Sequence, residues 1–503
     1  MPKSASRQGE CSRLQRRNSR ELGLFRHLKE IPVSQPAVSA ALASFAAHPP
    51  EVPQTALEDT QRSILDGLGC LLAGSVTPQA RMVQQVVHSL GHSDEATVFS
   101  AGRASAAGAA LANGVATHTL ELDDIHKGST IHAAAPVIPA ALAVAERERA
   151  SGAAFIRAVA LGYEAALRVG EAVNPSHYRY WHPTGTAATF GAAVAAGALL
   201  GLDERQMLDA LGSAGTQAAG LWEFNASGAM SKTLHPGKAA MNGVLSADLA
   251  RLGFSGAPAI LEGSRGFFQA TAAESDPSRV TDRLGEVWKV SENGYKLYSC
   301  CGHTHTAIDA ALDLRASRHW DAGQVLATIR EIRLETYGPG WAIVSEPNPT
   351  TPYQAKFSLA YVVCVALLEG AVGLEQFAPE RFGPAGVLEP GAAALLKRVQ
   401  TTVSSELTAR YPAAWPNRLE VELTSGEVLR VGGDFPRGNA ENPVSTELLE
   451  AKFLNLVGAQ VSSGAAESAL ELIRQLDAIP DMRVACLALN DLISTENHRE
   501  ERA

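Results

Sequence analysis

The sequence predicts a mainly α-helical protein with a smaller α+β domain. Apolar residues recur at helical spacing from Ala37 onward, alternating strand-like segments are confined to a middle region, and helical spacing returns after Asn442. Glycine is abundant, with 44 residues, and aromatic residues make up only 6% of the chain, which favours closely packed helices. We therefore expect a large helical domain built from both chain ends, residues 36–283 and 441–495, with an inserted α+β lid domain, residues 284–440.

The composition limits the kinds of partner that the chain can bind. A hydrophobic content of 46% with 19% charged residues is typical of a globular chain with a large core. A net charge of -10 argues against a nucleic-acid partner, and it means that an anionic substrate needs a locally basic pocket. We find no uncharged apolar run of about 20 residues, so we expect no membrane partner and a cytoplasmic location.

Residues 1–35 differ from the rest because they carry many arginines and no apolar periodicity. We expect a disordered basic tail, and residues 496–503 form a second short tail. An organelle transit peptide is an alternative for the first tail, although its glutamates argue against one, and an overlong gene start is another. The six cysteines have no CxxC or Cys/His metal spacing, which predicts a reducing compartment and no metal site.

The first half of the chain reads as consecutive helices. The pattern predicts helices over 38–48, 57–75, 80–91, 103–120 and 152–173, with Gly128 as the stop of the fourth and a short connection over 97–102. A further helix is expected over 133–145, where Pro136 and Pro139 fall near its beginning. These segments predict a helix bundle.

The segment from Glu121 to Glu146 holds three acids, two histidines and a lysine just before an apolar run. His132 falls next to the expected helix N-terminus, where free amide groups and the helix dipole favour a bound carboxylate. The alternative interpretation is a solvated turn whose histidine caps the helix. Other segments must supply matching groups to decide between the two.

Two later segments repeat this arrangement. His182 precedes a helix made almost wholly of small apolar residues, which has no polar face and must be central. Lys232 and His235 lie on a Gly/Ser-rich turn before another small-residue helix. Each could be a capping residue by itself, but three basic groups at helix entrances suggest one shared anionic ligand.

The middle region predicts the α+β domain. A strand is expected from Gly285, then an irregular turn and a helix; a period-two strand begins at Ile329, and a hairpin turns at Ser425 and Gly426. Lys356 lies near a helix start and could equally be a surface residue. The irregular turn carries Lys296, Tyr298, Cys300, Cys301, His303 and His305.

Five segments carry a resemblance to a known family: HTLELDDIHKGSTIH, WHPTGTAATFGAA, SKTLHPGKAA, KLYSCCGHTHTAIDAA and QAKFSLAYV. In this order, over about residues 38–495, they resemble the MmgE/PrpD family, which includes 2-methylcitrate dehydratases, cis-aconitate decarboxylases and an iminodisuccinate epimerase. The resemblance implies a helical large domain with an α+β lid, a homodimer, and a cleft that uses no metal or organic cofactor. It also implies that Asp124, His132, His182 and Lys232 line the cleft.

The known activities of the family share proton transfer at a carbon next to a carboxylate. Lys232 and the helix N-termini would stabilise the enediolate, His132 and His182 would exchange protons, and Asp124 would orient a neighbour. We expect a cofactor-independent lyase of a small di- or tricarboxylic acid, with an epimerase or a non-catalytic polycarboxylate-binding protein as alternatives. The residues expected to bind the other substrate carboxylates are His235, Lys296, His305 and, unless it is a structural thiol, Cys301.

This sequence departs from common family patterns at three positions. Where many members read D-x-D-D-T, this chain has Glu121 first and Ile125 last, and Cys301 replaces a histidine of some decarboxylases. The resemblance therefore implies the type of chemistry more strongly than a particular substrate.

Overall fold

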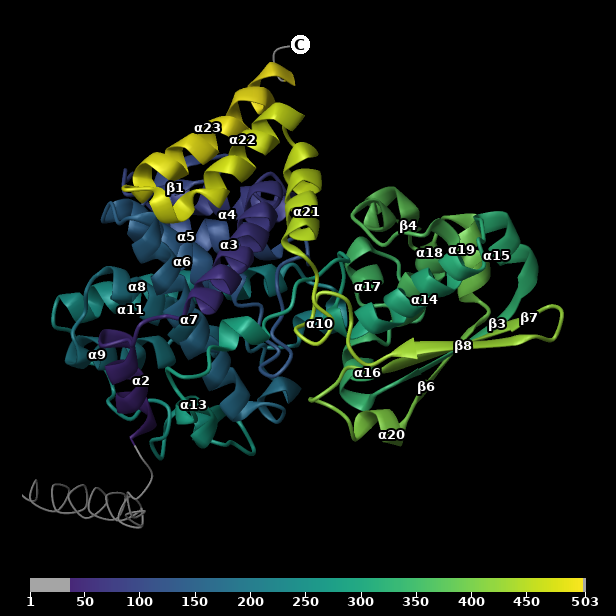
Figure 1. Ribbon diagram of the computed structural model, residues 1–503, viewed down its shortest axis with the longest axis horizontal. Coiled ribbons are helices and arrows are strands. Elements are labelled where there is room, and N and C mark those ends of the chain that lie inside the picture. Colours follow the sequence, from purple (N-terminus) through teal and green to yellow (C-terminus); the bar gives the residue numbers. More distant parts are fainter. Residues whose placement is uncertain (1–36, 501–503) are drawn as a thin grey trace, which may run out of the picture. The chain divides into compact units, whose positions relative to one another are not determined.

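A computed structural model of the protein describes residues 37–500 (Figure 1). It confirms the predicted class, a mainly helical protein with a smaller α+β part. The larger hydrophobic core combines side chains from residues 38–295 and 449–493, and a second core combines residues 298–423. The predicted basic tail, residues 1–35, lies outside the described residues. None of the described helices is long and apolar enough to span a membrane.

The larger core is built mainly by helices that pack closely because small residues line the faces that touch. Gly114 and Gly237 illustrate this, since a Cβ atom on Gly114 would lie 2.7 Å from the Cα atom of Gly237. The first group of helices is α2 (Val38–Ala47), α3 (Gln54–Gly74), α4 (Pro78–Ser89), α5 (Ala106–His118), α6 (Ala134–Arg147), α7 (Gly152–Val173), α8 (Ala188–Leu199), α9 (Glu204–Gly215), α10 (Phe224–Ser227), α11 (Ser231–Arg251), α12 (Phe267–Thr271) and α13 (Ser278–Thr281).

The C-terminal helices α21 (Thr446–Gly458), α22 (Ser463–Arg474) and α23 (Met482–Glu500) complete this core. Helix α21 begins after Ser445, whose hydroxyl accepts a hydrogen bond from the Leu448 amide. Helix α21 packs against α3, and the Lys452 ammonium donates to the Asp66 carboxylate and to the Leu122 carbonyl, both at 2.6 Å. The last helical segment therefore supports the loop that follows α5.

The smaller core packs helices against a four-stranded sheet in the order β6-β3-β7-β8. The predicted strand and hairpin are confirmed as β3 (Ile329–Thr336), β7 (Asn417–Leu423) and β8 (Val428–Gly433), with Gly426 at φ +87° in the turn. Strand β6 (Val399–Val403), which the pattern did not reveal, pairs parallel to β3. Helices α14 (His305–Ser317) and α18 (Leu359–Glu369) pack against the sheet (Figure 1).

Shorter elements connect the main ones. Two small hairpins are β1 (Ala96–Val98) with β2 (Gly102–Ala104), and β4 (Phe382–Gly383) with β5 (Gly386–Val387). The remaining helices are α15 (Ala322–Thr328), α16 (Gly338–Val344), α17 (Pro352–Lys356), α19 (Pro390–Leu396) and α20 (Ser405–Thr408), and the 3-10 turns are η2 (His177–Arg179), η3 (Lys289–Glu292), η4 (Gly302–Thr304), η5 (Glu375–Phe377), η6 (Pro379–Arg381) and η7 (Leu476–Ala478).

Four local predictions were wrong. The segment after Gly285 forms η3 and irregular backbone instead of a strand, and its apolar side chains pack in the larger core. Helix α5 ends at His118, ten residues before Gly128, because the chain leaves it to form the acidic loop. The connection over 97–102 is part of a hairpin. Lys232 and His235 lie inside the first turns of α11 rather than on a turn before it.

Candidate active site

The site is organised around the acidic loop, residues 119–133, between α5 and α6. Glu121 and Thr130 have positive φ values, +58° and +55°, which turn the loop sharply. The Ile125 amide donates to the Gly294 carbonyl at 2.8 Å, and the Gly294 amide donates back at 3.0 Å. This pairing fixes the loop against the segment that carries Lys296. As a result the loop's acidic side chains are buried.

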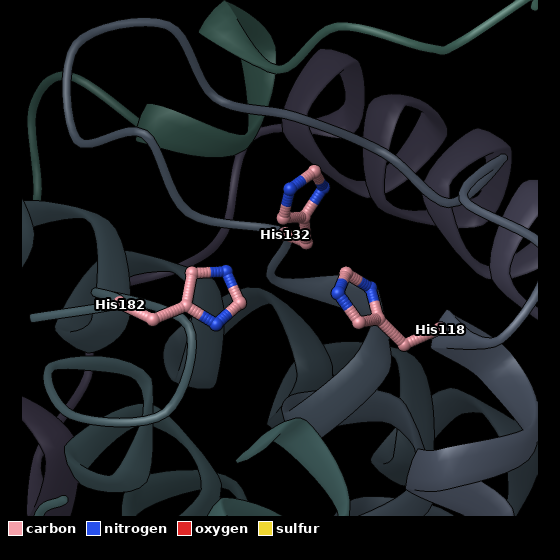
Figure 2. A group of neighbouring side chains, drawn as sticks. All are labelled: His118, His132 and His182. Carbon is pink, nitrogen blue, oxygen red and sulfur yellow. The ribbon is translucent and has the colours of Figure 1, made fainter. Parts of the chain in front are cut away.

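Three imidazole rings from separate segments face one another (Figure 2). His118 ends α5, His132 lies just before α6, and His182 follows η2. The ring centres of His118 and His132 are 4.9 Å apart, and that of His182 lies 5.8 and 6.1 Å from them. The structure thus brings the predicted residues His132 and His182 together, and adds His118.

Hydrogen bonds fix the tautomer of two of these rings. His118 Nδ1 lies 2.7 Å from Asp123 Oδ2, and His132 Nδ1 lies 2.6 Å from the carbonyl oxygen of Asp124. Both partner oxygens only accept, so each Nδ1 donates and each neutral ring keeps its lone pair on Nε2. Among the described residues, His118 Nε2 has no hydrogen-bond partner although it is buried. Such an atom is available to a ligand.

His182 is supported by a different contact. Its Nδ1 shares a hydrogen bond with Nδ1 of His235 at 3.1 Å, and Trp222 packs with its ring centre 5.0 Å away. Burial lowers the pKa of both His132 and His182 well below the ordinary value. Burial also lowers the pKa of His235, to about 4. These rings are therefore neutral near pH 7 and suited to accept protons.

Ammonium groups surround the carboxylate of Glu121. Lys232 donates to its Oε1, and Lys296 donates to Oε2 at 3.2 Å. Lys356, at the end of α17, contacts the same loop. Its ammonium donates to the Leu120 carbonyl at 2.8 Å, and it also donates to Ser299 Oγ at 2.9 Å. Burial opposes ionisation of Glu121, but Lys232 and Lys296 outweigh burial and hold its pKa well below the usual range.

Asp124, a predicted catalytic residue, directs its carboxylate into the scaffold. Its Oδ1 accepts from the Ala134 amide at 3.0 Å, at the start of α6, and its Oδ2 accepts from the Tyr163 hydroxyl at 2.7 Å and from Asn293 Nδ2 at 2.8 Å. Burial raises its pKa to about 7 despite these bonds. Only its backbone carbonyl touches an imidazole of the site. This geometry suits the orienting role expected from the sequence.

Two predicted binding residues are placed differently from each other. The Cys301 amide donates to the Lys356 carbonyl at 3.0 Å. Burial raises the pKa of the Cys301 thiol, although the charges of Lys296 and Lys232 oppose that shift, so the thiol lies beside the ammonium groups. His305 instead packs on Tyr298, and its Nε2 lies 3.3 Å from the Cys300 carbonyl. His305 therefore has no described contact with the imidazole group.

The sequence prediction missed three site residues, His118, Glu121 and Asp123. All lie in the segment HTLELDDIHKGSTIH, at the end of a helix and the start of a loop. Their spacing from one another fits neither a helix nor a strand, so periodicity gives no sign that they converge. The segment did contain the signal, because a histidine followed by three acids within six residues is unusual in an otherwise apolar region.

Within residues 37–500, two groups of side chains have donor atoms close enough to hold a metal ion. One ring nitrogen from each of His118, His132 and His182 lies within 4.8 Å of the others. Burial is the largest cause that lowers the pKa of His132 there, while the charge of Lys296 lowers it further and that of Asp123 raises it. The second group is His126, Glu171 and Glu292. It already surrounds the Lys289 ammonium, which lies 3.1 Å from both carboxylates.

Comparison with known proteins identifies the family. Residues 40–280 match the MmgE/PrpD N-terminal domain, and residues 298–478 match the MmgE/PrpD C-terminal domain. The chain is 28% identical over 464 residues to a cis-aconitate decarboxylase of Aspergillus terreus, covering 88% of this chain and 93% of that protein. It is 27% identical over 440 residues to the cis-aconitate decarboxylase of Homo sapiens, covering 85% and 89%. The two domain matches together span most of the chain, which therefore belongs to the MmgE/PrpD family.

Proposed function

We propose that this chain is a lyase that removes CO2 from a small tricarboxylic acid such as cis-aconitate. The observation that carries this proposal is the convergence of ammonium groups and imidazoles around one acidic loop, since Lys232 and Lys296 both bind Glu121 while His118 lies 3.8 Å from the same carboxylate. The similarity to proteins named cis-aconitate decarboxylases supports the choice of reaction.

Substrate carboxylates would bind where Glu121 now binds. In the described state, Glu121 neutralises Lys232 and Lys296, both of which are buried. A polycarboxylate that enters must share or replace these contacts, because buried ammonium groups need a counter-charge. The contacts between the substrate carboxylates and the ammonium groups would be strong, because charge-assisted hydrogen bonds are shorter and stronger than neutral ones. Lys356 is a third donor for the same ligand.

The reaction then requires charge stabilisation and one proton. When the C–C bond to the leaving carboxylate breaks, CO2 departs and the electron pair moves into an extended enediolate on a remaining carboxylate. Lys232 and Lys296 would stabilise that negative charge without reorganisation. One proton from an imidazole then forms the new C–H bond, and solvent restores that proton. His132 and His182 are the residues predicted to exchange protons at the substrate carbon.

The same groups would also support dehydration, in which hydroxide leaves as water, as in a 2-methylcitrate dehydratase. Epimerisation of an iminodisuccinate-like acid, with return of the proton to the opposite face, is a further alternative, as is binding without turnover. We also propose that residues 284–440 serve as a lid and that the protein is a homodimer, as the family resemblance implies. Light scattering of the purified chain tests the dimer.

The deciding experiment is an NMR screen of the purified chain in D2O with cis-aconitate, 2-methylcitrate, citrate and iminodisuccinate. Decarboxylation is expected to consume cis-aconitate, release CO2 and place one deuterium in the product. Loss of water from 2-methylcitrate or citrate instead would identify a dehydratase. Exchange with an intact carbon skeleton would identify an epimerase. If none of the acids is consumed, the lyase proposal is wrong.

A further inference from the structure

His118 is an imidazole of the site to which the mechanism above assigns no step. Its side chain is fully buried at the end of α5, and its Nδ1 is held by Asp123 at 2.7 Å. On the other side, Nε2 has no hydrogen-bond partner among the described residues and lies 3.8 Å from Glu121 Oε1. A buried polar atom without a partner is uncommon in a folded protein and calls for a ligand or a chemical role.

The charges around His118 differ from those around His132. His118 has a carboxylate at each ring nitrogen, Asp123 at Nδ1 and Glu121 at Nε2. His132 donates Nδ1–H to a neutral carbonyl, and its distance to Asp123 Oδ2 is 4.0 Å. A carboxylate in direct contact stabilises an imidazolium more than a carbonyl does. The two rings therefore face different charges, although their centres are only 4.9 Å apart.

The carboxylate of Asp123 is placed to orient His118. Its Oδ2 faces the ring, while its Oδ1 has no hydrogen-bond partner among the described residues. Burial opposes its ionisation, but the two neighbouring histidines hold its pKa below the usual range. In its neighbour Asp124, by contrast, both carboxylate oxygens accept hydrogen bonds, from the start of α6, Tyr163 and Asn293.

We propose that His118, oriented by Asp123, is the residue that donates the proton at the substrate carbon. The inference rests on the proposed function and names the donor of its proton-transfer step. In decarboxylation, the N–H bond at His118 Nε2 breaks, the proton bonds to the carbon that carries the enediolate charge, and the ring becomes neutral. Solvent returns the proton before the next turnover. His118 is therefore a catalytic residue and Asp123 a positioning residue.

The first test compares His118→Gln and Asp123→Asn with His126→Gln. His126 is the matched control, since it is buried on the same loop but pairs with Glu171 and Glu292. Loss of a general acid is expected to lower kcat about 10²- to 10⁴-fold in His118→Gln with little change in KM. The control should stay near the wild-type rate. A wild-type kcat in a folded His118→Gln variant would overturn the proposal.

The pH profile separates positioning by Asp123 from simple support of the fold. A general acid must be protonated, so kcat falls as pH rises through its titration. Removing the Asp123 charge weakens the imidazolium, and Asp123→Asn should shift this high-pH limb to lower pH. An unshifted limb contradicts the role. The other titratable groups that interact with His118 are Glu121, His132, His182 and His235, all retained in this variant.

A second measurement does not depend on turnover and so separates this inference from the proposed function. Nitrogen-15 NMR of the histidine-labelled wild-type chain distinguishes an imidazolium from a neutral ring, and His118→Gln assigns the signal. We expect the His118 signal to change in Asp123→Asn more than the His132 signal, because Asp123 contacts Nδ1 of His118 whereas the Asp124 carbonyl contacts Nδ1 of His132. An unchanged His118 signal would overturn the assignment even if the chain is an active lyase.

Discussion

Two groups of polar side chains contact the acidic loop, one buried and one partly exposed, and they differ in how many of their polar atoms have partners. His126 accepts the Ser129 amide at Nδ1, at 3.2 Å, and directs Nε2 toward Glu171 and Glu292, 3.7 and 3.6 Å away. Lys289 completes that group by binding both glutamates. Across the loop, Nε2 of His118 has no hydrogen-bond partner in the part of the chain that the structure describes. One group is a closed ion-pair network, and the other has an atom left for a ligand.

The comparison indicates that the ring nitrogen held by the scaffold, rather than the residue type, decides whether a histidine can act on a ligand. In the His126 group the backbone amide takes the lone pair, so the ring offers N–H to carboxylates and stays structural. In the His118 and His132 pair, oxygen acceptors bind Nδ1 of each ring, so Nε2 of each ring is left to act on a ligand. Substitutions in the two groups should therefore have unequal effects, which the following predictions measure.

The largest difference is expected between His132→Gln and His126→Gln. Glutamine at position 132 keeps a polar side chain but removes an imidazole that is predicted to exchange protons at the substrate carbon, so kcat should fall about 10²- to 10⁴-fold. The same change at position 126 should leave kcat within a few fold. Steady-state kinetics with the best substrate from the screen measures both. Equal losses in the two variants would mean that both histidines only support the loop.

Glu121→Gln should chiefly affect stability. The change leaves two buried ammonium groups, Lys232 and Lys296, without their counter-charge, which costs about 3–5 kcal/mol. Glu171→Gln should cost less, since Lys289 keeps Glu292. Thermal unfolding with and without tricarballylate, an unreactive tricarboxylate, is the measurement. The ligand should raise the Tm of Glu121→Gln more than that of the wild type, and an equal rise would contradict competition for the lysines.

Lys232→Met should lower kcat about 10²- to 10³-fold, because one donor to the enediolate is lost while Lys296 still neutralises Glu121. Lys289→Met is the matched control, since it removes an ammonium group from the closed network instead. Circular dichroism confirms folding, and initial rates measure the loss. A wild-type rate for Lys232→Met would remove it from the mechanism.

The smallest effect concerns Asp124, whose pKa of about 7 exceeds its ordinary value of 3.8. The folded state binds this proton more tightly, so the contribution to stability is present below about pH 4 and is lost as pH rises through 7. The free energy of unfolding should fall by about 1 kcal/mol per pH unit across that window. Urea titrations should show a flatter profile for Asp124→Asn. A profile parallel to the wild type would place the titration elsewhere.

The sequence predicted the helices well because their packing is local and periodic. The Ala/Gly-rich pattern of α8 has no polar face, and the structure buries that helix throughout nearly all its length. Strand β6 was not predicted because its burial does not alternate cleanly. It is held in the sheet by its pairing with β3. The expected strand after Gly285 failed because its apolar residues anchor irregular backbone to the larger core.

The candidate site was only partly predictable. The sequence predicted His132, His182 and Lys232 because each lies near the start of a helix. The structure brings their segments together around the acidic loop. The roles of His118 and Asp123 depend on a loop with two positive-φ residues and on a pairing with Gly294, both of which are tertiary features. His305 shows the opposite case, since a histidine in the resembling segment packs away on Tyr298.

The central claim is that these imidazoles and ammonium groups surround one polycarboxylate. A crystal structure of the protein with bound tricarballylate tests it most directly. We predict carboxylates within hydrogen-bond distance of Lys232 and Lys296, with the carbon chain between His118 and His132. Tricarballylate bound elsewhere, with Glu121 still holding both lysines, would contradict the account.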